Sequence, residues 1–254
     1  MNTAGKVIIT LASIATVIAI IAGVYMNVFK GRSFHFKFSS KMTEDTVTLD
    51  GDVRNLTVNI DYADVTVQPG EELSVAYSLP ESMVPTISLQ NGSLEVKSPT
   101  NFVTLPVQSF GNCYVTVTVP EDCDPEQVTL NVDAGNQKVN DLQCGKLDVH
   151  ADAGDVEVEN VKTPEIAVHV DAGNMELKGC ETETLSVSAD AGNLDISDSS
   201  IYKIDDKVDA GNIEAKNSTI DTGICKTDLG NIKLSGEIGD VEAKSSVGNV
   251  SIPR

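Results

Sequence analysis

Residues 147–177 read LDVHADAGDVEVENVKTPEIAVHVDAGNMEL and contain the motif Asp-Ala-Gly twice, 19 residues apart. A fixed period near 20 residues is typical of an array of stacked structural units. Around the repeated aspartate the chain reads VDAGN, ADAGD, VDAGN, ADAGN, VDAGN and TDLGN, and a last, shifted copy follows at Val247-Gly248-Asn249. The interval of 19 residues separates six aspartates in succession: Asp133, Asp152, Asp171, Asp190, Asp209 and Asp228.

Apolar residues alternate with polar residues on both sides of each aspartate. In one copy Leu147, Val149 and Ala151 precede it at odd distances, and Val156 and Val158 follow it. Period-two alternation predicts β-strands with one buried face. Each repeat is therefore expected to hold two short strands joined by the D-A-G-N corner, with a polar loop that returns to the start.

The corner motif has a physical explanation in the conformations of its residues. Alternation predicts that the aspartate points outward and that the following alanine points inward, where its small size suits a tight bend. Glycine can adopt φ > 0, and the asparagine or aspartate after it can bond to local backbone groups. The apolar phase then shifts by one residue, as it does at a bend or bulge.

The regular spacing decides between two repetitive folds. An array of antiparallel hairpins could repeat, but a solenoid requires coils of nearly equal perimeter, and five equal intervals meet that requirement. We therefore predict an all-β protein, a parallel β-solenoid (β-helix) with 19-residue coils over residues 131–254. The L-x-x-L-x-L-x-x-N pattern of leucine-rich repeats is absent. Asp206 and Cys225 occupy inward positions and are expected defects in the core.

Residues 46–130 are less regular and are expected to form an N-terminal β region or cap, because an open sheet edge needs blocking. Within them VTLDGDVRNLTVNIDYADVTVQPG resembles one repeat, with Asp61 and Asp64 at its corner. Further strands are predicted near Leu73–Tyr77, Thr86–Leu89, Ser93–Val96 and Tyr114–Val119.

An uncharged apolar stretch lies near the N-terminus. Residues 7–29 are long enough to cross a ~30 Å hydrocarbon layer as a helix. They exceed the ~7–15-residue apolar core of a cleaved signal peptide, so an uncleaved transmembrane signal anchor is expected. The solenoid is thus expected to be preceded by one transmembrane helix, and the membrane is a predicted partner through residues 7–29. Residues 1–6 would be a short tail and residues 30–45 a linker.

The charges around this stretch bear on its orientation. Lys6 precedes it, whereas Lys30, Arg32, Lys37 and Lys41 follow it, which by the positive-inside rule favours an internal domain. We expect the opposite, because an isolated N-terminal anchor before a long acidic β domain usually leads an exported domain. The prediction is a single-pass protein of the cell membrane with an extracellular acidic domain.

Composition excludes some partners. The chain has 38 acidic and 18 basic residues, a net charge of −20, and should repel nucleic acid and anionic lipid. No nucleic-acid partner is expected. Aromatic residues make up 4% of the chain and Trp is absent, so Val, Ile, Leu and Ala must build the core.

Acidic side chains recur on the predicted surface. The corner aspartates would form a column if coils stack ~4.8 Å apart. Calcium could relieve the repulsion within such a column, but the calcium repeat G-G-x-G-x-D is absent, and a solvated surface explains these residues without metal. A second outward column would hold Glu157, Glu176, Asp195 and Glu214.

Other candidate residues do not converge on a site. His150 and His169 share one outward repeat position and could hold zinc, but no third ligand is evident. Cys113 and Cys123 could pair across a turn or remain buried thiols, and five cysteines do not form a full disulfide framework. Repeated carboxylates single out no glycosidase pair. We therefore predict no catalytic residues, no cofactor, no metal site and no small-molecule substrate.

The N-terminal anchor, the strand YADVTV at residues 62–67 and the LxVxxDAGNxxV repeats together resemble the bacterial "putative-adhesin" domains of unknown function over residues 46–254. Members occur in Gram-positive bacteria, some beside cell-envelope stress genes. The resemblance implies a surface-exposed β-repeat domain and brings no catalytic residues. The expected function is a membrane-anchored, envelope-exposed, adhesin-like binding or structural module with a protein or cell-wall polymer as partner. The alternative is an accessory or sensor component of an envelope stress response.

Overall fold

The computed structural model describes residues 41–99 and 112–252. The predicted membrane anchor at residues 7–29 lies outside these ranges. Among the helices of the described part, none is long and apolar enough to cross a membrane. The described strands belong to one compact unit, Ser39–Arg254.

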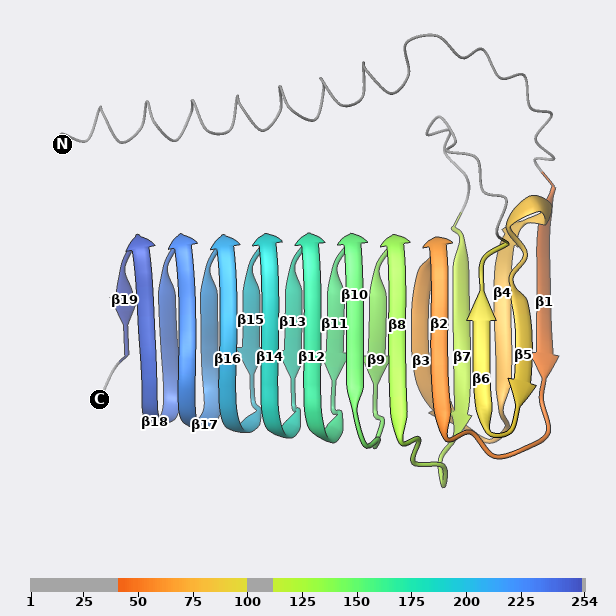
Figure 1. Cartoon of the computed structure of the whole chain (residues 1–254), viewed down its shortest axis with the longest axis horizontal. Coiled ribbons are helices and arrows are strands. Elements are labelled where there is room, and N and C mark those ends of the chain that lie inside the picture. The colour runs from red at the N-terminus through yellow and green to blue at the C-terminus, as the bar shows by residue number, and fades with distance from the viewer. Residues whose placement is uncertain (1–40, 100–111, 253–254) are drawn as a thin grey trace, which may run out of the picture. The chain divides into compact units, whose positions relative to one another are not determined.

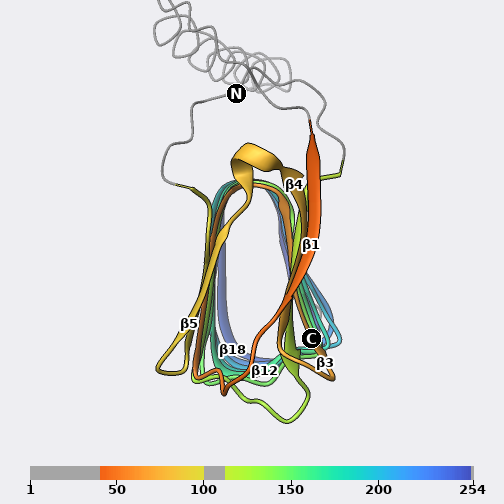
Figure 2. The same cartoon turned by 90° about the vertical axis from the view of Figure 1, so that its right-hand side faces the viewer.

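The prediction of a parallel β-solenoid is confirmed. Each strand of the repeats pairs in parallel with the strand one coil further along, so that Leu147 lies opposite Ile166 and Val156 lies opposite Met175. Figure 1 shows the coils side by side, and Figure 2, turned to look along the stack, shows each coil as a flattened loop with strands on its long sides. The strands of the repeats are β8 (Gln127–Ala134), β9 (Gln137–Asn140), β10 (Leu147–Ala153), β11 (Val156–Glu159), β12 (Lys162–Ala172), β13 (Met175–Lys178), β14 (Glu181–Ala191), β15 (Leu194–Ser197), β16 (Ser200–Ala210), β17 (Ile213–Leu229), β18 (Ile232–Val247) and β19 (Val250–Ser251).

The predicted inward residues are buried, but the corner alanine is not. Leu147, Val149 and Ala151 are buried, whereas Ala153 and Ala172 are exposed. The expectation that this alanine points inward is therefore wrong. The chain bends so that two successive side chains, the aspartate and the alanine, both lie on the outer side of the corner, and the alternation resumes after the glycine.

Glycine is required at this corner because neighbouring coils approach closely. A Cβ at Gly154, whose φ is 147°, would lie 2.0 Å from the carbonyl oxygen of Gly135. A Cβ at Gly173 would lie 1.9 Å from the carbonyl oxygen of Gly154. Any side chain would thus displace the backbone of the adjacent coil.

The return to the next coil is not the polar loop that the sequence suggested. A left-handed residue such as Asn160 (φ 53°) or Gly179 (φ 64°) turns the chain after the second strand. Val161 and Cys180 then point into the core, and Lys162 pairs in parallel with Glu181. The return segment therefore closes the core on a third side.

The interval between the last two copies of the corner motif is one residue shorter than the other intervals. Leu229 lies opposite Val247, and the pairing of β17 with β18 shifts between Ala215 and Ser218. This irregularity removes one residue from the final coil and explains why its copy of the corner motif at residues 247–249 is out of step.

Residues 46–130 contribute a coil as well as a cap. β2 (Asn55–Tyr62) and β3 (Asp64–Gly70) pair in parallel with β8 and β9. Tyr62 lies opposite Ala134, which places Asp61 and Asp64 at the corner as predicted. This coil is inserted between the β8–β9 coil and the strands β6 and β7, so spatial order departs from chain order (Figure 1).

The N-terminal end of the stack is closed by antiparallel strands. β4 pairs antiparallel with β7 and β1, and β5 pairs antiparallel with β6. The strands expected in this region are confirmed, whereas β1 begins inside the expected linker 30–45. The elements are β1 (Met42–Thr48), β4 (Ser74–Pro80), the 3-10 turn η1 (Glu81–Met83), β5 (Thr86–Gln90), β6 (Ser93–Lys97) and β7 (Tyr114–Pro120).

The two predicted core defects are real. Cys225 is fully buried and Asp206 is 1% exposed. Neither carboxylate oxygen of Asp206 has a hydrogen-bond partner in the described residues. Val187, Asp206 and Cys225 occupy the same inward column in three successive coils.

Candidate functional site

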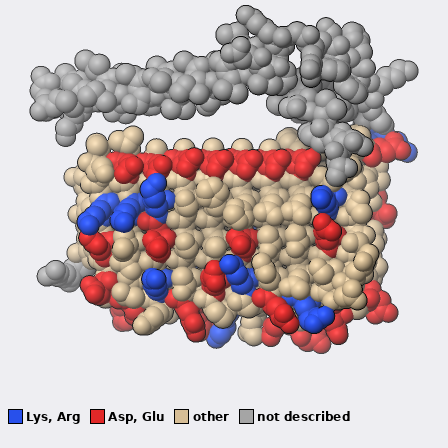
Figure 3. All heavy atoms as spheres, in the orientation of Figure 1, with Lys and Arg blue, Asp and Glu red and all other residues tan. Residues whose placement is uncertain are grey.

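The corner aspartates form the predicted column on the surface. The strand registers align Asp133 to Asp228 coil by coil and add Asp61 at the N-terminal end. Figure 3 shows acidic residues in a row along one edge of the stack. Partial burial raises the pKa of Asp133, and the charges of Asp61 and Asp152 raise it further. A row of like charges at coil spacing favours extended cationic partners over a single small ligand.

The residue after the corner glycine stabilises the stack in a way that the sequence did not reveal. The Oδ1 atom of Asn193 accepts from the backbone N–H of Asn212 at 3.0 Å and from its Nδ2 at 2.9 Å. Asn174 receives the same two bonds from Asn193, at 3.2 and 3.0 Å. We expected bonds to local backbone groups, but these bonds link consecutive coils. The ladder continues through Asp64, Asn136, Asp155, Asn231 and Asn249.

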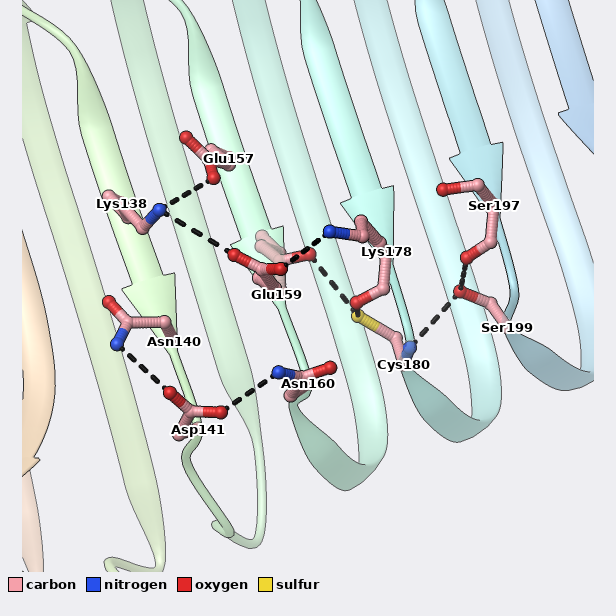
Figure 4. A network of polar contacts seen from close by, with 11 residues as sticks. Lys138, Asn140, Asp141, Glu157, Glu159, Asn160, Lys178, Cys180, Ser197 and Ser199 are labelled. Atoms are coloured by element: carbon pink, nitrogen blue, oxygen red, sulfur yellow. Dashed lines mark hydrogen bonds and ion pairs between the residues drawn. The ribbon is translucent and has the colours of Figure 1, made fainter.

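The second acidic column, on β11, β13, β15 and β17, is bounded by lysines. Lys138 lies 2.6 Å from Glu157 at one end, and Lys233 lies 2.7 Å from Glu214 at the other. Figure 4 shows Lys138 also near Glu159, whose other partner is Lys178. These exposed ion pairs contribute little stability each, but they neutralise part of this face.

The two histidines are neighbours without the geometry of a zinc site. The ring centroids of His150 and His169 are 5.8 Å apart. His150 Nε2 lies 3.0 Å from Asp148, and His169 Nε2 lies 3.2 Å from Asp171. Throughout residues 41–99 and 112–252, no group of three or more His, Cys, Asp or Glu side chains is arranged to hold a metal ion.

The five cysteines are free thiols. Cys113 and Cys123 are therefore not bridged; the Cys123 thiol instead donates to the carbonyl oxygen of Val53 at 3.2 Å. Burial raises the pKa of every one of them, which keeps the reactive thiolate scarce at neutral pH.

A groove that the repeat pattern does not reveal runs across several coils where the return segment meets the long strands. Its volume is about 370 Å³. The chain bulges here at one outward repeat position, which is left out of the parallel pairing. The Thr182 hydroxyl lies beneath the bulge, 3.2 Å from the Pro164 carbonyl oxygen and 3.0 Å from that of Thr184. The bulge residues that line the groove are Pro164, Glu183, Tyr202 and Asp221.

Tyr202 is the distinctive side chain of this groove. It is 63% exposed, more than any other large apolar side chain among the described residues. It lies between Glu183 and Asp221 in the bulge column, beside Glu181 and Ser200. A ring flanked by carboxylates and hydroxyls can stack on an apolar surface of a ligand while its neighbours accept and donate hydrogen bonds. The sequence signal that could have indicated this groove is Tyr202, an aromatic residue at a repeat position that holds Pro164, Glu183 and Asp221 in other coils.

These features define the class as a parallel β-solenoid with a cap of antiparallel strands and rows of like side chains on its surface. The family model described as Toastrack DUF4097 matches residues 53–254. The chain therefore belongs to the Toastrack DUF4097 family. No curated protein matches the chain.

Two solved structures have a similar fold. A "putative adhesin" from Bacteroides fragilis NCTC 9343 is 16% identical, with 85% of this chain and 99% of that chain covered and a TM-score of 0.51. A "putative adhesin" from Parabacteroides merdae ATCC 43184 is 18% identical, with 86% and 100% covered and a TM-score of 0.50. At such identities the likeness concerns the fold alone.

Proposed function

We propose that this protein is a membrane-anchored, envelope-exposed binding module, adhesin-like and without catalytic activity, whose partner is an extended cell-wall polymer. The observation that supports this function most directly is the groove that crosses consecutive coils at Tyr202. A polymer with a regular repeat can contact several coils at once, whereas a compact substrate would meet only one or two.

The groove has the chemistry of a glycan-binding surface. Tyr202 offers a ring face for the apolar side of a sugar, and Glu183 and Ser200 offer hydrogen-bonding groups at its sides. The descriptions of the two similar structures as adhesins agree with a binding role. The row of corner aspartates would in turn keep the domain away from anionic polymers and select neutral or cationic ones.

Binding to isolated cell-wall sacculi tests this proposal. The chain should sediment with sacculi, and Tyr202→Ser should reduce the bound fraction at least five-fold. Leu229→Ser is the matched control, because Leu229 is an exposed large apolar residue outside the groove. Equal binding by the wild type and Tyr202→Ser would contradict the role of the groove.

Exposure at the envelope is tested separately. Protease added to spheroplasts should digest the acidic domain without lysis. Protection that disappears on lysis would show that the domain lies inside, as the lysines after residue 29 favour by the positive-inside rule.

A further inference from the structure

The groove at Tyr202 lies between two rows of side chains that run along the stack. In the first row each residue pairs in parallel with its equivalent one coil further on, and the members are Gln143, Lys162, Glu181 and Ser200. The second row is the bulge column, with Pro164, Glu183, Tyr202 and Asp221. Between the rows lie the buried side chains of Thr163 and Thr182. The groove therefore runs across the strands from coil to coil and can hold a linear chain.

The two walls of the groove differ in charge. Among the described residues that line it, the cation is Lys162, and its Nζ lies 2.9 Å from a carboxylate oxygen of Glu181 in the same wall. The bulge column contributes two carboxylates, Glu183 and Asp221, and no cation to this lining. The exposed Lys203 of β16 does not line the groove. A ligand therefore meets uncompensated negative charge along the bulge column.

The exposed ring of Tyr202 lies in the middle of this negative wall. The strand registers place Glu183 one coil before it and Asp221 one coil after it. Parallel strands lie about 4.8 Å apart, and a cation within about 6 Å of an aromatic centroid is attracted to the ring face. An ammonium group over the ring is thus within reach of both carboxylates. This arrangement favours a protonated amine over a neutral amide.

On the basis of the binding function proposed above, we infer that the groove takes a glycan whose amino sugars are unacetylated. The apolar face of such a sugar stacks on the Tyr202 ring, and its ammonium group lies between Glu183 and Asp221. Gln143 and Ser200 in the opposite wall offer hydrogen-bonding groups to the sugar hydroxyls. An N-acetylated sugar carries no charge at this position, so it makes the stacking contact without the two ion pairs.

Two hexasaccharides of the same backbone test this inference: β-1,4-linked glucosamine and its N-acetylated form. Titration calorimetry with the full-length chain in mild detergent, at a pH of about 5.5 where the sugar amines are protonated, measures both dissociation constants. The wild type should bind the glucosamine hexamer at least about ten-fold more tightly, because two exposed ion pairs and a cation–π contact each add a small increment. Glu183→Gln combined with Asp221→Asn should reduce this preference below about three-fold and leave the Kd of the N-acetylated hexamer within about two-fold of the wild-type value.

Three further variants are the controls. Tyr202→Phe keeps the ring and should bind both hexamers as the wild type does, whereas Tyr202→Ser should weaken the binding of both. Asp195→Asn removes an exposed carboxylate of β15 outside the groove and should leave the preference unchanged. Equal binding of the two hexamers by the wild type would overturn the inference. A preference that survives the double substitution, or that Asp195→Asn reduces as much, would also overturn it, because the amines would then bind the acidic surface in general.

The outcomes also separate this inference from the proposed function. If the wild type binds sacculi through Tyr202 but does not distinguish the hexamers, the groove binds glycans and only the preference for amines is wrong. If neither sacculi nor hexamers bind, both proposals fail. Hexalysine is the probe for a basic peptide as the occupant. If Tyr202→Ser weakens hexalysine binding as much as binding of the glucosamine hexamer, the groove takes peptides and the glycan assignment is overturned.

Discussion

Replacing the buried Asp206 with valine should stabilise the folded domain by about 2.5–4.5 kcal/mol at pH 4, where the carboxyl carries its proton. A buried polar group without a partner costs about 1–3 kcal/mol, and an apolar side chain in its place adds about 1.5 kcal/mol through burial. Valine also suits the position, because the same column holds Val149, Val168 and Val187 in the three preceding coils.

The stability advantage of Asp206→Val over the wild type should grow as the pH rises. Burial raises the pKa of Asp206 well above its ordinary value, and the charge of Asp205 raises it further; the backbone at Val187 opposes the shift without forming a hydrogen bond of good geometry. Because the folded-state pKa is the higher one, the stability that this group contributes is fully present below the unfolded pKa of about 3.9. It is lost as the pH rises towards the folded pKa, at about 1.4 kcal/mol per pH unit. The Cys225 thiol, whose pKa burial also raises, stays neutral in this range.

Urea unfolding of residues 31–254 at pH 4, 5.5 and 7, followed by circular dichroism, measures both effects. Asp195→Val is the control, since it removes the same charge from an exposed strand position that does not contribute to the pKa shift of Asp206. The control should change the free energy of unfolding by less than about 0.5 kcal/mol. The assignment of Asp206 as an unpaired buried acid would be refuted if Asp206→Val were no more stable than the wild type. It would also be refuted if the difference in free energy of unfolding between the two proteins did not increase with pH.

Three further predictions concern the corner and the anchor. Gly173→Val should lower the free energy of unfolding by about 1–3 kcal/mol, because its Cβ would lie 1.9 Å from the Gly154 carbonyl oxygen. Lys178→Val, at an exposed position, should have a small effect, and equal effects of the two substitutions would mean that the glycine is no structural corner. Asn193→Ala removes an acceptor that holds the next coil and should cost about 1–2 kcal/mol in urea unfolding, whereas an unchanged midpoint would show that the ladder adds nothing. Deleting residues 1–30 should yield a soluble domain with a β-type circular dichroism spectrum; an unfolded product would show that this segment belongs to the core.

Local patterns in the sequence were sufficient to predict the strands and the corner of a single coil. Alternation of apolar and polar residues depends only on which side chains a strand must bury, so Leu147, Val149 and Val156 could be assigned to the core from their spacing. The 19-residue interval fixed the perimeter of the coil, and even the divergent copy at Asp61 and Asp64 was placed at its corner correctly. The groove carried a weaker signal, a single aromatic residue, Tyr202, at a position that the period alone did not mark as special.

The tertiary structure decided whatever depends on contacts between coils. Spatial order was one such feature, because β2 can pair with either β6 or β8 by its own pattern and the fold places it between the two. The bonds of Asn193 were another, since their partner lies 19 residues away along the chain and next to it across the stack. The outward turn of Ala153 and the burial of Cys180 likewise follow from closing a loop on itself. A repeat in sequence determines the shape of one coil, whereas the packing of one coil on the next determines which groups meet.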